Sequence, residues 1–192
     1  MATETKNENP GDVENSIGMP SAVFVEDVEE FMKAEENQEV EATLRRFDEQ
    51  HNKYKFMERN LVTKKARLKA QIPDIKTSLD IVRYLKSKKD SKEPTETRFL
   101  LSEVLYAKAS VPPTEKVCLW LGANVMLEYN LEDAENLLSK NLEQAKTSFG
   151  NADTDLGFIR DQTTTLEVNM ARVYNFDVKK RQAQKAVAAT SS

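Results

Sequence analysis

The chain has 192 residues, enough for one domain or two small ones, and 31% of them are charged while 7% are aromatic. That composition suits a long solvated coiled coil better than a compact enzyme. With one cysteine, Cys118, and one histidine, His51, an internal disulfide and any metal site built from several cysteines or histidines are excluded. No apolar run approaches the roughly 18 residues of a membrane span, and the acidic start lacks the basic-then-apolar order of a secretory signal. We therefore expect a soluble cytoplasmic protein and leave nuclear entry open.

The first 39 residues are strongly acidic, with eleven acidic and two basic side chains. Residues 1–19 are polar and contain Pro10, Gly11 and Gly18, so we expect most of residues 1–39 to be disordered. The exception is a short amphipathic helix near residues 24–32, where apolar side chains recur at helical spacing among acidic ones.

Two segments of nearly equal length carry an apolar repeat of 3.5 residues. Steps of four and three from Val40 to Lys86 meet fourteen positions, ten of them apolar or aromatic; from Leu138 to Val173 they meet eleven, ten of them apolar. A seam sustained over so many turns is typical of a coiled coil. We expect helices over residues 40–89 and 131–178, folded back on each other as an antiparallel hairpin, and a disordered tail over 179–192.

Three residues inside these helices are unusual. Pro73 has apolar seam positions on both sides, which indicates a kink and not an end of the first helix. Gly150 and Gly157 each cost about 1 kcal/mol relative to alanine, so the distal part of the second helix should be locally soft.

Residues 97–129, between the helices, predict four short strands in two hairpins. Pro112-Pro113 and Gly122-Ala123-Asn124 supply the turns. Residues 116–121 are apolar on both faces of the strand, and a lone hairpin is neither covered nor stable. We expect an α+β, mainly α fold whose hairpins contribute to an oligomeric β-barrel, which also removes their open edges. The expected interface residues are Phe99, Leu101, Val117, Leu119, Trp120, Leu121, Val125 and Leu127.

Signals for other chemistry are weak. The basic run from Lys64 to Lys69 lacks the interleaved aromatics of a single-strand reader, so a solvated helix face is the simpler interpretation. Asp153, Asp155 and Asp161 lack the loop spacing of a calcium site. His51 occupies a seam position, where a tolerated polar residue is the simpler interpretation than a catalytic base. With no phosphate loop, nucleophile elbow or metal motif, we expect no enzyme activity, no cofactor and no metal.

Several blocks of the sequence resemble the α-class subunits of the prefoldin family, and the layout of helix, two hairpins and helix does as well. The resemblance covers about residues 20–178. The blocks are Ala22–Met32 (AVFVEDVEEFM), Asp48–Met57 (DEQHNKYKFM), Thr97–Leu101 (TRFLL), Ala107–Pro113 (AKASVPP), Lys116–Asn130 (KVCLWLGANVMLEYN) and Leu166–Val178 (LEVNMARVYNFDV).

The resemblance implies a fold and an activity. Residues 40–178 would form the α-type prefoldin domain. Such domains join one further α-class chain and four β-class chains in a hexamer with a double β-barrel platform and six coiled coils. The family captures unfolded chains, notably actin and tubulin, and passes them to the cytosolic chaperonin without ATP. Neither nucleic acid nor membrane is an expected partner.

A chaperone of this kind needs weak, plural and non-directional contacts with exposed apolar surface. The helix ends far from the hairpins carry the candidate client-binding residues: Phe56, Met57, Phe158, Val168, Tyr174 and Phe176. Alternatively, these side chains simply widen the seam between the helices. Two other function classes stay open, a coiled-coil adaptor or scaffold and a nucleic-acid-associated dimer. An adaptor would not need a strand that is apolar on both faces. A nucleic-acid-binding dimer would normally carry its basic region as a separate extension outside the coiled-coil seam.

Overall fold

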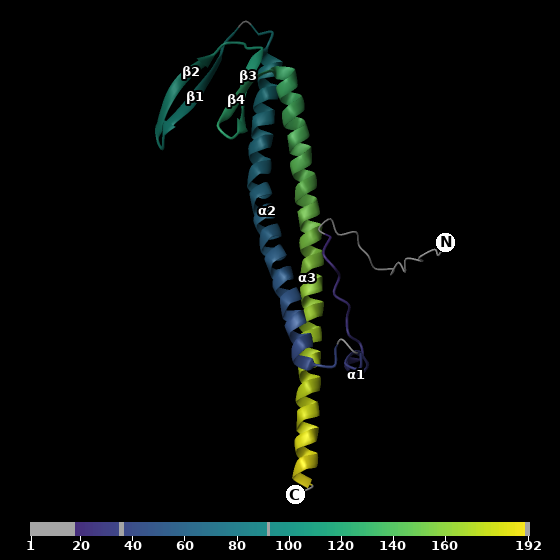
Figure 1. Cartoon of the computed structure of the whole chain (residues 1–192). Helices are drawn as coiled ribbons and strands as arrows, with labels where there is room; N and C mark the ends of the chain where they lie inside the picture. Colours follow the sequence, from purple (N-terminus) through teal and green to yellow (C-terminus); the bar gives the residue numbers. More distant parts are fainter. Residues whose placement is uncertain (1–17, 35–36, 92, 191–192) are drawn as a thin grey trace, which may run out of the picture. The chain divides into compact units, whose positions relative to one another are not determined.

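A computed structural model describes residues 18–34, 37–91 and 93–190 (Figure 1). Residues 1–17, for which disorder is predicted, lie outside the described residues. In chain order the elements are α1 (Val28–Phe31), α2 (Val40–Lys88), β1 (Thr95–Ser102), β2 (Leu105–Val111), β3 (Lys116–Gly122), β4 (Val125–Asn130) and α3 (Leu131–Thr190). The predicted class, mainly α with two hairpins between two long helices, is confirmed. The chain divides into two compact units, Ala66–Phe149 and the remainder on either side of it.

Both long helices follow the sequence closely, apart from the end of α3. Helix α2 runs through Pro73 without ending, as predicted. Helix α3 continues to Thr190, so the predicted end at 178 and a disordered tail over 179–190 are wrong. Those residues include no glycine or proline and are mostly alanine, lysine, arginine and glutamine, which are strong helix formers.

Helix α1 is shorter than the sequence predicted, covering Val28–Phe31 instead of residues 24–32. The Asp27 carboxylate caps it, accepting from the backbone N–H groups of Glu29 (2.8 Å) and Glu30 (3.1 Å). The residues before Asp27 are not helical because their backbone groups bond to side chains of α3.

In the unit formed by the chain up to Lys65 and from Gly150 on, the core repeats every seven residues. Its centre is a row of buried side chains: Phe47, Tyr54 and Leu61 on α2, and Ala152, Ile159, Leu166 and Val173 on α3. Seven residues is the repeat that keeps one seam facing a partner helix, so the predicted coiled coil is present here.

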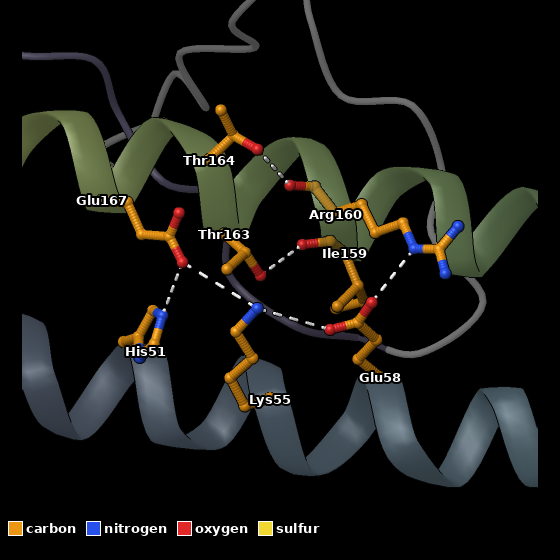
Figure 2. Close-up of polar contacts among 8 residues, drawn as sticks. All are labelled: His51, Lys55, Glu58, Ile159, Arg160, Thr163, Thr164 and Glu167. Carbon is orange, nitrogen blue, oxygen red and sulfur yellow. Dashed lines mark hydrogen bonds and ion pairs between the residues drawn. The ribbon is translucent and has the colours of Figure 1, made fainter.

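Three polar pairs flank this seam, also at intervals of seven residues: Lys65–Asp153, Glu58–Arg160 (3.0 Å) and His51–Glu167 (2.9 Å). Figure 2 shows the last two pairs, with Lys55 lying between Glu58 and Glu167. From one pair to the next, the residue number rises by seven on α3 and falls by seven on α2, so the helices are antiparallel. The hydrogen bond from Arg160 holds the pKa of Glu58 below its usual value. Because such exposed pairs contribute about 0–1 kcal/mol each, they fix register more than they add stability.

The unit Ala66–Phe149 has a smaller core, in which Val82 of α2 and Leu131 and Ala134 of α3 are buried. Both hairpins belong to this unit. Strands β1 and β2 form one antiparallel sheet, and β3 and β4 form another. The turn between β3 and β4 has positive φ at Gly122 (89°), Ala123 (49°) and Asn124 (60°), which is the backbone that the turn signal predicted.

Gly157→Ala should stabilise the chain by about 1 kcal/mol, because Gly157 is helical and an added Cβ would meet no atom within 4 Å. Urea unfolding followed by far-UV circular dichroism measures the change. Gly122→Ala is the matched control, since its φ of 89° strains any side chain and the same substitution should destabilise. Destabilisation by Gly157→Ala would mean that this helix face is not open.

Candidate interaction surfaces

The sheet of β3 and β4 is partly covered on one face. Val117, Leu119 and Tyr129 pack against the cluster of Val82 and Leu131, so this chain's own helices cover that part of the face, while Leu127, the cross-strand partner of Leu119, stays 48% exposed. On the other face Trp120 is 62% exposed and Met126, its cross-strand partner, is 56% exposed. The sequence predicted that the strand needs cover from other chains on both faces, and on the inner face this is wrong for Val117 and Leu119, which this chain's own helices cover.

The sheet of β1 and β2 has no cover from the described part of the chain. Phe99 is 63% exposed, and Leu101 and Leu105 are exposed as well. Leu100 and Tyr106 face each other across the strands and are also exposed, so the hairpin is apolar on both faces near its turn. Exposed apolar surface of this extent marks a protein–protein contact.

The eight predicted interface residues therefore separate into two groups. Val117 and Leu119 contact this chain's own helices, and the other six are exposed. The sequence prediction missed five further exposed apolar residues of the hairpins: Leu100, Val104, Leu105, Tyr106 and Met126. The sequence could have indicated these five residues, because they are apolar and lie within the segment predicted to form the hairpins.

The six predicted client-binding residues also separate by exposure. Phe56, Val168 and Tyr174 are exposed, with Tyr174 lining an open groove beside Leu44 and Met170. The other three, Met57, Phe158 and Phe176, pack against the buried core. For these three, the alternative interpretation as a widened seam describes their placement better.

A further surface is formed by residues 19–32, which we call the strap and which run along the two helices. Met19, Ala22, Val25, Val28 and Phe31, at every third position, are buried or half-buried against the core, whereas the residues between them are mostly exposed. Met32 is buried as well, and the Phe31 ring stacks on Phe47 at 6.0 Å. The predicted disorder is therefore wrong for residues 19–23, which lie before the helix predicted near 24–32.

Polar side chains of α3 hold the strap by its backbone. Gln162 accepts from the N–H of Ala22 at 2.7 Å. Asn169, which is buried, accepts from the N–H of Val25 at 3.0 Å and donates to the carbonyl of Val23 at 2.8 Å. Arg172 donates to the carbonyl of Glu26 at 2.7 Å and lies over the Phe24 ring.

Helix α2 contributes one further contact, since the Tyr54 hydroxyl donates to the carbonyl of Pro20 at 2.6 Å and accepts from Gln50. Burial raises the pKa of Tyr54, against the opposing effect of the Gln50 hydrogen bond. Sequence reasoning missed these polar residues. Gln162 and Asn169 are seven residues apart beside the seam, so they lie on one face of α3. No sequence pattern near them indicates that their side chains bind the backbone of another segment.

The weaker candidates gain no support. His51 pairs with Glu167 beside the seam, as a polar seam residue would. Asp155 is buried and Asp153 pairs with Lys65, so the acidic run is not the fully solvated face that was expected. Within the described ranges, no group of three or more His, Cys, Asp or Glu side chains could hold a metal. No described helix is long and apolar enough to cross a bilayer.

Comparison with known proteins gives clear relatives. The family model Prefoldin, described as "Prefoldin subunit", matches residues 54–176. Prefoldin subunit 3 of Homo sapiens is 59% identical over 165 residues, covering 86% of this chain and 84% of the human protein. Prefoldin subunit 3 of Drosophila melanogaster is 50% identical over 182 residues, covering 95% and 92%. A chain of filamentous PFD from Methanocaldococcus jannaschii is 20% identical over 63% of this chain and 98% of that one; its TM-score of 0.48 is too low to support an argument.

Asn169→Ala should lower the free energy of unfolding by about 1–3 kcal/mol, because it leaves backbone groups of Val23 and Val25 without their partner. Hydrogen exchange should show faster exchange at the Val25 amide. Asn175→Ala on the same helix is the control, since Asn175 is exposed and its removal should change neither quantity. Unchanged protection of Val25 in Asn169→Ala would contradict the role assigned to this side chain.

Proposed function

This chain belongs to the prefoldin family, and from that premise we propose that it acts as subunit 3 of a heterohexameric chaperone that works without ATP. As a prefoldin subunit it is a chaperone component that associates with other prefoldin subunits, and it is not an enzyme. In the proposed assembly it joins one further α-class and four β-class chains in the cytoplasm, with nuclear entry open. The assembly captures unfolded actin and tubulin and delivers them to the cytosolic chaperonin.

One observation carries the assembly half of this proposal. The two hairpins expose large apolar side chains from all four strands, including Phe99, Trp120 and Leu127, while only Val117, Leu119 and Tyr129 pack against this chain's own helices. Apolar surface removed from water contributes roughly 25 cal/mol per Å². Such hairpins therefore favour association with other chains, which supports a shared β-barrel built from several subunits.

The capture half of the proposal is supported by apolar side chains elsewhere in the chain. Phe56, Val168 and Tyr174 are exposed on the helices of the other unit. Aromatic and aliphatic contacts of this kind are non-directional, so they suit clients of varied sequence. Several weak binding sites on several subunits raise the overall affinity for one client through effective concentration, so no single contact needs to be tight.

Trp120→Asp should prevent assembly with the other subunits while leaving this chain folded, because Trp120 is exposed in the chain and buried only in the assembly. A buried unpaired charge costs at least about 3 kcal/mol, which weakens association more than about a hundredfold. Native mass spectrometry of the co-expressed subunits measures this. Ile81→Asp is the control, as Ile81 is exposed on α2 outside the hairpins. An intact hexamer containing Trp120→Asp would overturn the platform assignment, and a homodimer of the wild type would favour the adaptor.

Replacing Phe56, Val168 and Tyr174 together with serine should leave the hexamer intact and weaken capture of unfolded actin. At about 1 kcal/mol for each of the three apolar side chains, the loss should be roughly a hundredfold. Suppression of actin aggregation at varied hexamer concentration measures it. The double substitution Ile81→Ser and Tyr84→Ser removes comparable exposed apolar surface from the hairpin-bearing unit and should have little effect. Equal loss in both variants would argue against specific grips on this subunit.

A further inference from the structure

The strap is held in a way that does not depend on its own sequence. Gln162, Asn169 and Arg172 bind four backbone groups of residues 22–26, at 2.7 to 3.0 Å. Every peptide bond offers the same N–H and C=O groups, so these side chains would bind any extended segment placed there.

The side chains of the strap add only a loose apolar requirement. The surface of α2 and α3 that the strap covers, which we call the strap groove and which is distinct from the groove beside Tyr174, takes up Met19, Ala22 and Val25 at every third position, and these differ in size and shape. A period of three is that of an extended polyproline II segment, whose backbone makes no internal hydrogen bonds and is free to bond elsewhere. Val23, between them, is 77% exposed, so that position is unconstrained, whereas the Phe24 ring contacts Arg172.

We propose that this groove between α2 and α3 is a binding site for extended apolar segments of unfolded polypeptides, and that the strap fills it as an internal competitor. The proposal rests on the proposed chaperone function and specifies one of its sites and how that site is regulated. An unfolded chain offers what the strap offers, an extended backbone with an apolar side chain at intervals. Client binding then requires displacement of the strap.

Exchange of this kind has a quantitative consequence. A site that is free only a fraction of the time shows an affinity reduced by that fraction, so release of a strap that fills the groove nine-tenths of the time strengthens binding roughly tenfold. The strap is tethered a short distance from its groove, which gives it a high effective concentration and explains how weak contacts keep it in place.

The test uses the hexamer reconstituted with the full-length chain and a fluorescein-labelled peptide of residues 18–34, followed by fluorescence anisotropy. Val25→Asp releases the strap, because Val25 is 7% exposed, and leaves the groove residues of α2 and α3 unchanged. We expect this hexamer to bind the peptide roughly tenfold more tightly than the wild type. A permanently unfolded, reduced and alkylated protein should displace the peptide, and Asn169→Ala in the same background should abolish its binding.

Val23→Asp is the matched control, introducing the same charge two residues away on an exposed side chain, and it should bind the peptide as the wild type does. If Val25→Asp does not assemble, the wild-type hexamer provides the test. Saturating unfolded protein should then speed hydrogen exchange at the Ala22 and Val25 amides. No gain in peptide binding, or unchanged exchange at these amides, would overturn the proposal.

These outcomes separate the two proposals. A wild-type hexamer that suppresses aggregation while its strap stays fixed would refute the internal competitor and leave the chaperone function standing. A hexamer that binds the peptide in the groove but protects no client would refute the chaperone function alone.

Discussion

The seven-residue repeat of buried side chains between α2 and α3 is the constraint on which one unit of the chain depends. That unit contains the start of α2 and the end of α3. Tyr54, Ile159 and Val173 are fully buried in it, and they fix which face of each helix turns inward. Polar side chains beside that seam then recur at the same seven-residue interval, including the ion pairs His51–Glu167 and Glu58–Arg160 of Figure 2. The same periodicity sets Gln162 and Asn169 one above the other, where a single extended segment can bond to both.

Polar groups inside this seam are satisfied, and this gives the packing its specificity. Among the described residues, no buried side-chain nitrogen or oxygen lacks a hydrogen-bond partner. Asn169 and Tyr54 meet that requirement by bonding to the strap, and Thr163 by donating to the carbonyl of Ile159 at 2.7 Å. A buried amide left unpaired is costly, so the strap and the seam support each other.

The hairpin-bearing unit distributes its apolar residues in the opposite way. Its buried cluster is small, centred on Val82, Leu131 and Ala134, while the strands expose Phe99, Trp120 and many other large side chains. A unit whose strands leave many large apolar side chains exposed is suited to association, and the family relationship indicates other prefoldin subunits as partners. In the proposed function, assembly and client capture therefore draw on different parts of the chain, so that each can be altered without the other.

The sequence by itself determined the elements whose signals are local. The 3.5-residue repeat located both helices, since that periodicity belongs to a helix packed on a partner. Pro112-Pro113 and Gly122-Ala123-Asn124 located the connections on either side of β3, because few residues tolerate those backbone conformations. The turn at residues 103–104 between β1 and β2 had no such signal. Six of the eight predicted interface residues are exposed, as the apolar pattern of the strands implied, and their role in an interface stays a prediction.

Only the tertiary structure decided the rest. Among neighbours such as Phe56 and Met57, the rotation of the helix about its seam selects which one is exposed, and a repeat of apolar letters does not fix that angle. The strap was hidden for a different reason. Its apolar period of three is close to helical spacing and predicted a helix near residues 24–32, although only Val28–Phe31 is helical. Its partners Gln162, Asn169 and Arg172 lie about 140 residues further along the chain. Contacts between backbone and distant side chains leave no local pattern, so only folding brings them together.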